Sequence, residues 1–388
     1  MLTKNIRLKN FNIKTKTKEI INIFNNLKKD FTPKKKTIYS SLQHNYQYTY
    51  DKKVVKKYKK FSNFRIIGIG GSILGSKAIY DFLKHKIKKN FFFIDNLKIN
   101  NLEKKKKNHN NLIISKSGNT IETIVNVNLL IKKQDQNILI TENKKNYLNL
   151  LAEKLKADII HHNDYIGGRY SVLSEVGMLP AELMGLNIKN FKQLNFLIKN
   201  KSFFNNLISN VSSTLHFIQN KKFNSIILNY DEKSDSLFKW YQQLIAESLG
   251  KKKSGILPVI SNMPKDNHSV MQLYLDGFKN NFFTFFYVKE KKSLSLNNSI
   301  ILPEQNYLRN KKLDEIIFAQ KKATENVFKR KKIPFRSFEI NYRDEKTLGE
   351  LFCFFILETI LIGRALKINP FNQPAVELIK NETKKILI

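Results

Sequence analysis

Two glycine-rich turns carry short hydroxyl side chains that could hold an anion. GIGGS covers residues 68–72 and SKSGNT covers residues 115–120, and each follows an apolar run. Glycine lets a backbone approach an anion closely, and the start of the next helix supplies free N–H groups. The hydroxyls of Ser115, Ser117 and Thr120 suit the several oxygens of a phosphomonoester. The alternative is an ordinary helix cap beside a turn glycine.

The first turn fits neither familiar nucleotide fingerprint. The dinucleotide pattern G-x-G-x-x-G begins at Gly68, but Ile73 stands at its third glycine position. The Walker pattern begins at Gly70, but Ser76 stands where its lysine is required. The residues alone therefore leave open which kind of phosphate this turn would bind.

Several other side chains could bind charge or move protons. Arg169 follows two glycines, in a chain whose usual basic residue is lysine, which indicates a need for a permanent planar charge. Glu247, near the end of a predicted helix, is a candidate base, and the imidazole of His268 could transfer a proton. Lys380 follows Gln373 by seven residues, so both share one helical face. Taken singly, each also fits an ordinary structural or surface residue.

The sequence predicts no metal centre. His161 and His162 are adjacent, so they cannot face the same way on a helix or a strand, and we expect both at the surface. Cys353 is the single cysteine, which excludes a disulfide framework and a thiolate cluster.

The net charge of +37 is a poor guide to function. Nearly all of it is lysine, spread along a chain that is also rich in Asn, Ile and Phe, and A/T-rich codons are sufficient to explain that bias. No arginine-rich helix and no interleaving of aromatic and basic residues is present, so we expect no nucleic-acid partner. The positive field could still attract anionic metabolites. With no apolar span of membrane length and no secretory signal, a cytoplasmic protein is predicted.

Apolar runs and helical patterns alternate along the chain, which predicts an α/β protein of two tandem units, each a mainly parallel sheet with helices on both faces. Ligands bind such sheets at the carboxyl ends of the strands, where both hydroxyl turns fall. The polar segment 290–310 is predicted to be a surface excursion. The predicted strands are 64–70, 91–95, 111–116, 137–141, 224–230, 255–261, 281–289 and 335–340; the predicted helices include 72–85, 120–133, 346–366 and 372–386.

Six motifs, taken together and in order, resemble the phosphoglucose isomerase family. They are GIGGSILG, SKSGNTIET, GGRYSVLSEVGMLPA, ESLGK, DNHSVMQ and NQPAVELIK, and the match runs from about residue 64 to the C-terminus. The resemblance implies two sugar-isomerase (SIS) domains in a three-layer αβα arrangement. It also implies interconversion of glucose 6-phosphate and fructose 6-phosphate through a cis-enediol(ate), in glycolysis and gluconeogenesis. No cofactor or metal is implied. A homodimer is implied, with a histidine reaching the partner's site.

The resemblance also implies roles for individual residues. Arg169 would face the developing enediolate, and Glu247 would move the proton between C2 and C1. His268 and Lys380 would assist ring opening, and Gln373 would contact the substrate. The positions matching the phosphate segments are Gly71, Ser72, Ser115, Lys116, Ser117 and Thr120.

The predicted division of the chain has four parts. Residues 1–45 form an N-terminal arm, residues 46–190 the first SIS domain, residues 191–366 the second, and residues 367–388 a C-terminal helix with site residues.

Three positions depart from the family pattern. Asn119 stands where a threonine or another small residue is usual, which could alter one phosphate contact. Glu175 replaces a small residue and lies close enough to Arg169 to pair with it or to tune it. Ile379 stands where glycine commonly precedes the lysine, which weakens the assignment of Lys380.

Two other functions stay open at this point. The first is a bifunctional isomerase that also accepts mannose 6-phosphate. The second is a catalytically silent SIS protein that senses sugar phosphates. The presence of Glu247, His268 and Lys380 favours an enzyme, because a sensor needs a phosphate site but no base.

Overall fold

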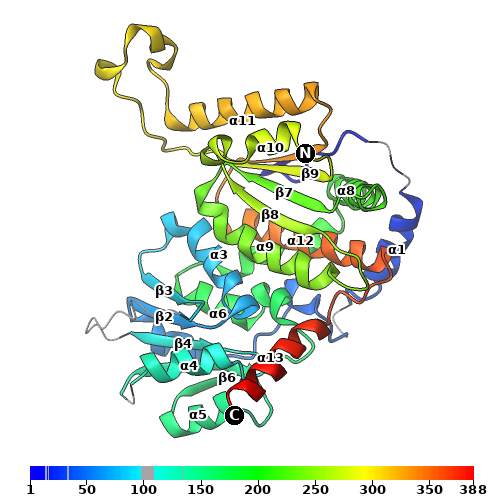
Figure 1. Ribbon diagram of the computed structural model, residues 1–388. Helices are drawn as coiled ribbons and strands as arrows, with labels where there is room; N and C mark the ends of the chain where they lie inside the picture. The colour runs from blue at the N-terminus through cyan, green and yellow to red at the C-terminus, as the bar shows by residue number, and fades with distance from the viewer. Residues whose placement is uncertain (14, 16, 33–34, 98–108, 133) are drawn as a thin grey trace.

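The structure is a computed structural model that describes residues 1–388 except 14, 16, 33–34, 98–108 and 133. Two five-stranded sheets form its framework, and helices pack on both faces of each (Figure 1). The predicted α/β class with two mainly parallel sheets is confirmed.

The first sheet is entirely parallel, with the strand order β3-β2-β4-β5-β6. Its central strand, β4, is buried at every residue, as expected for a strand covered on both faces. Alternate side chains face opposite sides, so Ile66 packs into the central core and Ile67 into an outer one. The strands are β2 (Asn63–Ile67), β3 (Asn90–Ile94), β4 (Asn110–Ile114), β5 (Gln136–Glu142) and β6 (Asp158–His162). Four were predicted, and β6 was missed.

The second sheet has the order β1-β10-β9-β7-β8 and is parallel except for β1. β1 pairs antiparallel with β10, so the start of the chain joins a sheet built from its second half. Four alternating residues gave too short a signal for β1 to be predicted. The strands are β1 (Ile6–Lys9), β7 (Asn224–Asn229), β8 (Leu257–Asn262), β9 (Asn281–Val288) and β10 (Phe335–Ile340).

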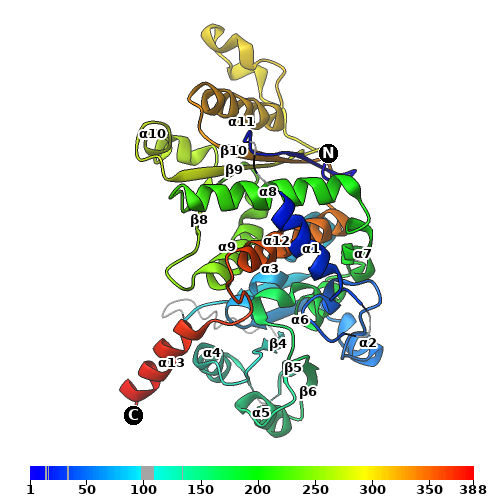
Figure 2. The same cartoon turned by 90° about the vertical axis from the view of Figure 1, so that its right-hand side faces the viewer.

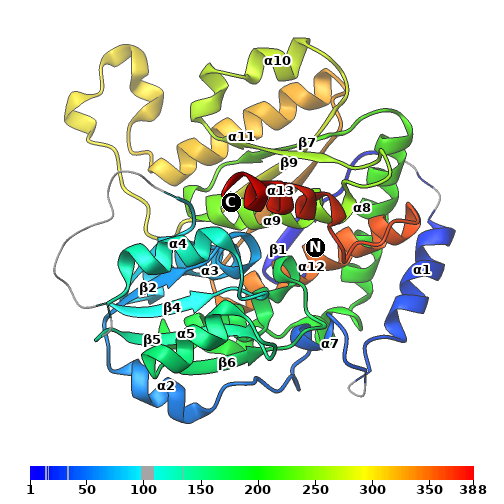
Figure 3. The same cartoon turned by 60° about the horizontal axis from the view of Figure 1, so that its bottom comes forward.

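A layer of helices lies between the two sheets (Figure 3). It contains α12 (Glu345–Ala365), which is buried along almost its whole length, and also α3 (Leu74–Phe82), α6 (Glu175–Leu183), α8 (Lys201–Gln219) and α9 (Asp235–Leu249). Their apolar side chains and the inner faces of both sheets share one large core. None of the helices in the described part of the chain combines the length and the hydropathy that a membrane crossing requires.

Each sheet has a second, smaller core on its outer face. α10 (Met271–Asp276) and α11 (Leu313–Arg330) cover the second sheet, and α11 was not predicted. α4 (Ile121–Leu130) and α5 (Tyr147–Leu155) cover the first sheet. The remaining α-helices are α1 (Lys18–Lys28), α2 (Lys52–Lys59), α7 (Leu194–Leu197) and α13 (Pro374–Ile386).

Two segments extend away from the cores. The predicted excursion at 290–310 is largely exposed and folds back on itself through a bridge between Ser295 and Lys312 (Figure 1). The helix α13 has no buried residue and leaves the body of the molecule after residue 373 (Figure 2).

Lys192 anchors the N-terminal segment to the first half of the fold. Its buried ammonium donates to the backbone carbonyls of Ser41 and Leu173 and lies 5.0 Å from the ring centroid of Tyr46 and 4.8 Å from that of Tyr48. Burial lowers the pKa of Lys192 to about 7. A neutral amine still has the two N–H donors that the two carbonyls need.

We predict a pH-dependent stability from this lysine. The folded chain releases the Lys192 proton near pH 7, whereas the unfolded chain holds it until about pH 10.4. Between those values the free energy of unfolding of the wild type should rise with pH. Its slope should exceed that of Lys192→Met by up to about 1.4 kcal/mol per pH unit. Urea unfolding between pH 6 and pH 10 measures both slopes. Parallel curves would show that the folded chain keeps this lysine charged.

Candidate active site

The two hydroxyl-rich turns lie side by side at the carboxyl ends of the adjacent strands β2 and β4. The two turns are close together at Gly68. A Cβ atom at this position would lie 2.8 Å from the carbonyl oxygen of Ile114 and 3.1 Å from Cβ of Ser72. Ser72 ends a short 3₁₀ turn, Gly70–Ser72, that leads into α3. The expected common edge is therefore present.

The second turn is shaped by a glycine that no other residue could replace without strain. Gly118 has φ = +68°, and a Cβ atom there would lie 2.1 Å from Oδ1 of Asn146. Within the turn, the hydroxyls of Ser115 and Thr120 hydrogen-bond to each other at 2.9 Å, and the exposed Ser117 accepts from the backbone of Asn119. Three hydroxyls thus surround one turn before α4.

Asn119 has a structural task in this turn. Its side-chain oxygen accepts a hydrogen bond from the backbone N–H of Tyr147 at 2.9 Å, at the first residue of α5. The departure from the family pattern therefore ties the turn to a neighbouring helix, and this oxygen is already engaged.

Lys116 connects the second turn to the segment that precedes Arg169, residues 163–168, here called the arginine loop. Its ammonium donates to the backbone oxygen of Asp164 at 2.6 Å and lies 3.3 Å from the carboxylate of Glu142. One cation therefore holds both the second turn and the arginine loop in place.

The first turn presses directly on the arginine loop. A Cβ atom on Gly71 would lie 2.2 Å from the carbonyl carbon of Gly168 and 2.5 Å from the backbone nitrogen of Arg169. Any side chain at position 71 would push this backbone away, so Gly71 sets the position of Arg169.

Arg169 is almost fully buried, with 2% of its surface exposed. Its Nε donates to Oγ of Ser248 at 2.8 Å, and Ser248 in turn bonds to the hydroxyl of Tyr170 at 2.7 Å. The Tyr170 hydroxyl donates to the backbone oxygen of Pro370 at 3.0 Å, and Nη2 of Arg169 donates to the same oxygen at 2.6 Å. Burial raises the pKa of Tyr170, so the phenol stays protonated. This chain of bonds fixes the plane of the guanidinium.

The other guanidinium nitrogen faces the predicted base. Nη1 of Arg169 lies 3.1 Å from Oε2 of Glu247 and donates to Oε1 of Gln373 at 2.8 Å. Gln243, one turn earlier on α9, donates to the second oxygen of Glu247 at 2.8 Å. Three of the residues singled out in the sequence, Arg169, Glu247 and Gln373, are therefore in contact.

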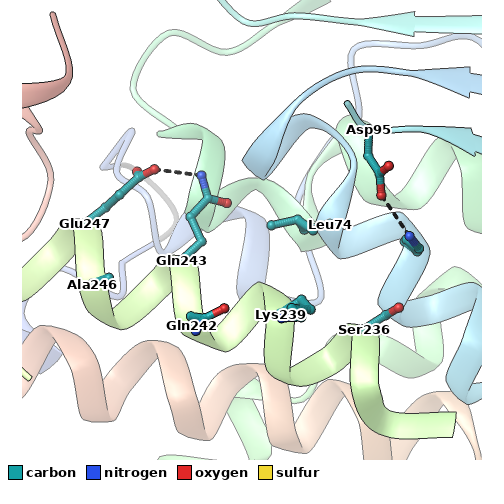
Figure 4. Close-up of a pocket in the computed structure, with 9 residues that line it drawn as sticks. Leu74, Asp95, Ser236, Lys239, Gln242, Gln243, Ala246 and Glu247 are labelled. Carbon is teal, nitrogen blue, oxygen red and sulfur yellow. Dashed lines mark hydrogen bonds and ion pairs between the residues drawn. The ribbon is translucent and has the colours of Figure 1, made fainter. Parts of the chain in front are cut away.

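Glu247 keeps 29% of its side chain exposed and lines a cavity of about 490 Å³ between α3 and α9. Gln243 and Glu247 point toward each other along one edge of this cavity, while Asp95 lies at the far end in an ion pair with Lys77 (Figure 4). A carboxylate held at both oxygens yet open to a cavity can meet a small polar ligand.

A further cation stands beside this pair. The ammonium of Lys251 donates to the backbone oxygens of Ser248 and Asn369, at 2.9 and 2.7 Å. Burial, followed by the charge of Arg169, lowers the pKa of Lys251 to about 8. Two basic side chains, Arg169 and Lys251, therefore lie in the neighbourhood of Glu247.

Comparison with known proteins gives the family. The profile described as phosphoglucose isomerase matches residues 28–263. The chain belongs to the phosphoglucose isomerase family, whose members are isomerases.

Relatives and structures agree with this assignment. A glucose-6-phosphate isomerase from Methanocaldococcus jannaschii is 34% identical over 352 residues, which cover 85% of each chain. Another from Mycoplasmopsis pulmonis is 35% identical, covering 83% of this chain and 82% of its own. The fold is also that of a hypothetical protein from Thermus thermophilus, which superimposes with a TM-score of 0.82 at 21% identity over 95% of both chains.

Two residues expected in a phosphoglucose isomerase site are not brought to it within this chain. His268 is exposed on a 3₁₀ turn, Lys265–His268, that follows β8. Lys380 is exposed on α13, where it pairs with Glu377 at 2.7 Å. No hydrogen bond or ion pair joins either residue to Arg169 or Glu247. In the described ranges, no group of three or more His, Cys, Asp or Glu side chains could hold a metal ion.

Two sequence expectations about this region are wrong. Glu175 does not pair with Arg169; it is fully buried and bonds to His162 at 2.6 Å. His162 is not at the surface, because alternation along β6 turns its ring inward, and only 3% of it is exposed. His161, which points the other way, is only partly buried.

Sequence reasoning missed three residues of the site. Ser248 and Tyr170 complete the bonding of Arg169, and Gln243 orients Glu247. The one available signal was the four-residue spacing of Gln243 and Glu247, which places both on one helical face. Ser248 and Tyr170 lie inside the motifs ESLGK and GGRYSVLSEVGMLPA, but the bond between them joins segments 78 residues apart and has no local signal.

Ser248→Ala should destabilise the fold by about 1–3 kcal/mol, because Nε of Arg169 and the hydroxyl of Tyr170 would each lose a buried partner. Ser62→Ala, at an exposed serine, is the matched control and should stay within about 0.5 kcal/mol of the wild type. Urea unfolding of the three proteins measures the difference. Equal stabilities would mean that the serine hydroxyl is not needed to hold the guanidinium.

Proposed function

We propose that this protein is an aldose–ketose isomerase that interconverts glucose 6-phosphate and fructose 6-phosphate. The observation that carries the proposal is the contact between the buried guanidinium of Arg169 and the cavity-lining carboxylate of Glu247, beside the hydroxyl-rich turns. The relatives named glucose-6-phosphate isomerase, at 34% and 35% identity, support it.

The phosphoryl group of the substrate would sit on the two turns. The hydroxyls of Ser115 and Thr120 now bond to each other, so both can rotate toward an incoming phosphate oxygen. Ser72 and Ser117 would add donors, while the turn at Gly71 would offer backbone N–H groups. Lys116 would add positive charge at the edge of the same turn.

Proton transfer between C2 and C1 would be the task of Glu247. The C2 proton beside the carbonyl of the open sugar is weakly acidic, so its removal needs immediate stabilisation of the negative charge that develops on oxygen. The guanidinium of Arg169 is held rigidly enough to supply it, because every nitrogen has a fixed acceptor. Returning the proton to C1 gives the ketose.

Ring opening would need His268 and Lys380 to reach the substrate by another route. We propose a homodimer in which His268 comes from the partner chain. The exposed apolar side chains of α13 support an association, since Leu378 and Ile379 are each 70% exposed. Gln373, at the start of α13, already bonds to Arg169, so this helix is joined to the site at its first turn.

We also propose the predicted domain boundaries, after residues 45, 190 and 366. A cytoplasmic location is the last part of this proposal. The division is supported by the two sheets, which lie within residues 63–162 and, apart from β1, residues 224–340. The location is supported by the relatives named glucose-6-phosphate isomerase.

Glu247→Gln should lower isomerase activity by about 10²–10⁴-fold, because the amide cannot accept the C2 proton. Activity is followed in a coupled assay, and exchange of the C2 proton in D₂O is followed by NMR. Binding of glucitol 6-phosphate, an open hexitol with no carbonyl, should change little.

Glu153→Gln is the control for this substitution, since Glu153 is an exposed glutamate on α5. It should behave as the wild type. If Glu247→Gln exchanges the C2 proton at the wild-type rate, another group is the base.

A hybrid dimer tests whether His268 acts across the subunit boundary. Glu247→Gln and His268→Ala homodimers should each be inactive. In a mixed dimer, one site would combine Glu247 of one chain with His268 of the other, so about half of the wild-type activity should return. If purified hybrids stay inactive, the two residues act within one chain.

A further inference from the structure

A buried cluster lies directly behind the arginine loop. His162 ends β6 and Glu175 begins α6, and their side chains are 1% and 0% exposed. Nδ1 of His162 lies 2.6 Å from Oε1 of Glu175, and Nε2 lies 3.0 Å from the backbone oxygen of Ile166. The imidazole therefore bridges a helix and the arginine loop.

The hydrogen-bond partners determine where the protons are. Oε1 of Glu175 also accepts from the backbone N–H of Asn163 at 3.1 Å, and Oε2 accepts from the hydroxyl of Tyr46 at 2.8 Å. That hydroxyl itself accepts from the side-chain amide of Asn163 at 2.8 Å, so its own proton points to Glu175. These bonds put a donor on each oxygen, as a carboxylate accepts them, and leave Nδ1 of His162 as the neighbour that shares a proton with Oε1.

With the proton between Oε1 and Nδ1 placed on the imidazole, His162 carries a proton on each ring nitrogen. One nitrogen faces the Glu175 carboxylate and the other faces the Ile166 carbonyl, and both of these groups can only accept. A neutral imidazole would place a lone pair against either the Ile166 carbonyl or the Glu175 carboxylate, depending on its tautomer. Burial alone would raise the pKa of Glu175, but the hydrogen bond and the charge of His162 hold it below its ordinary value. Lys192 lies behind the Tyr46 ring, and below about pH 7 its ammonium adds positive charge on that side.

The contacts of this pair fix the arginine loop at two points. Glu175 holds the N–H of Asn163, and His162 holds the carbonyl of Ile166, three residues before Arg169. Lys116 holds the carbonyl of Asp164 between them. The chain then continues into Gly168, whose backbone presses on Gly71.

We propose that His162 and Glu175 are positioning residues, a buried imidazolium–carboxylate pair that holds the arginine loop so that Arg169 meets the charge developing on the substrate. The inference rests on the proposed isomerase function. Neither side chain touches the cavity that Glu247 lines, so the pair acts through the backbone.

Two substitutions at His162 separate its two hydrogen bonds. Asparagine places its amide nitrogen near the position of Nδ1, so His162→Asn keeps a donor to Glu175 and loses the bond to Ile166. Glutamine places its amide nitrogen near the position of Nε2, so His162→Gln keeps the bond to Ile166 and loses the other. Both variants remove the positive charge, and both are compared at a temperature where thermal unfolding shows them folded.

His162→Asn should lower kcat by about 10–100-fold, because a displacement of the order of 1 Å at Arg169 is enough for that loss. His162→Gln should retain kcat within about threefold of the wild type, and KM should stay within about threefold in both variants, because Arg169 acts on the transition state. His161→Asn and His161→Gln, at the neighbouring ring on the other face of β6, are the matched controls.

A second measurement needs neither activity nor a stable variant. In the wild type labelled with ¹⁵N histidine, NMR at pH 7 should show both ring nitrogens of His162 protonated. The chain has 7 histidines, and the His162 signals are those that His162→Gln removes; if that variant does not fold, His161→Gln and single substitutions of the other histidines assign them by elimination.

The outcomes are distinct. An unprotonated nitrogen in His162 overturns the ion pair, and equal kcat in His162→Asn and His162→Gln, or a change confined to KM, overturns the positioning role. An inactive wild type whose His162 is doubly protonated would instead mean that the proposed isomerase function is wrong.

Discussion

The burial of one guanidinium organises this protein. Arg169 is a permanent charge with almost no access to water, and such a group is stable only when acceptors surround it. Those acceptors come from Glu247 and Ser248 on α9 and from the backbone around Pro370, about 80 and 200 residues further along the chain. The fold must therefore bring three distant segments to one point, and Glu247, which bonds to the guanidinium there, also lines the neighbouring cavity.

The backbone around this arginine leaves little freedom. Gly71 has no room for a side chain against Gly168, and Lys116 holds the carbonyl of Asp164. The same contacts that fix the arginine loop join it to both hydroxyl-rich turns. The two hydroxyl-rich turns and the buried guanidinium are thus parts of one connected unit, as the proposed binding of a sugar phosphate at one end and reaction at the other would require.

Much of the fold was readable from periodicity. The buried strands β2, β4, β7 and β9 are short, continuous apolar runs, and all were predicted. β1 and β6 were missed, because an edge strand of four or five half-exposed residues has no distinctive pattern. The ordered motifs indicated the family, and the contact of Arg169, Glu247 and Gln373 agrees with the residues they singled out.

Sequence alone determined the chemistry available: hydroxyls and glycines in two turns, one unusual arginine, one helical glutamate and the family that combines them. Tertiary structure decided which groups meet. Ser248, Tyr170 and Gln243 entered the site, while His162 and Glu175 turned inward to bond to each other. The physical reason is that a buried polar group must find a partner, and the partners available to it are set by the packing of distant segments, which local sequence patterns do not encode.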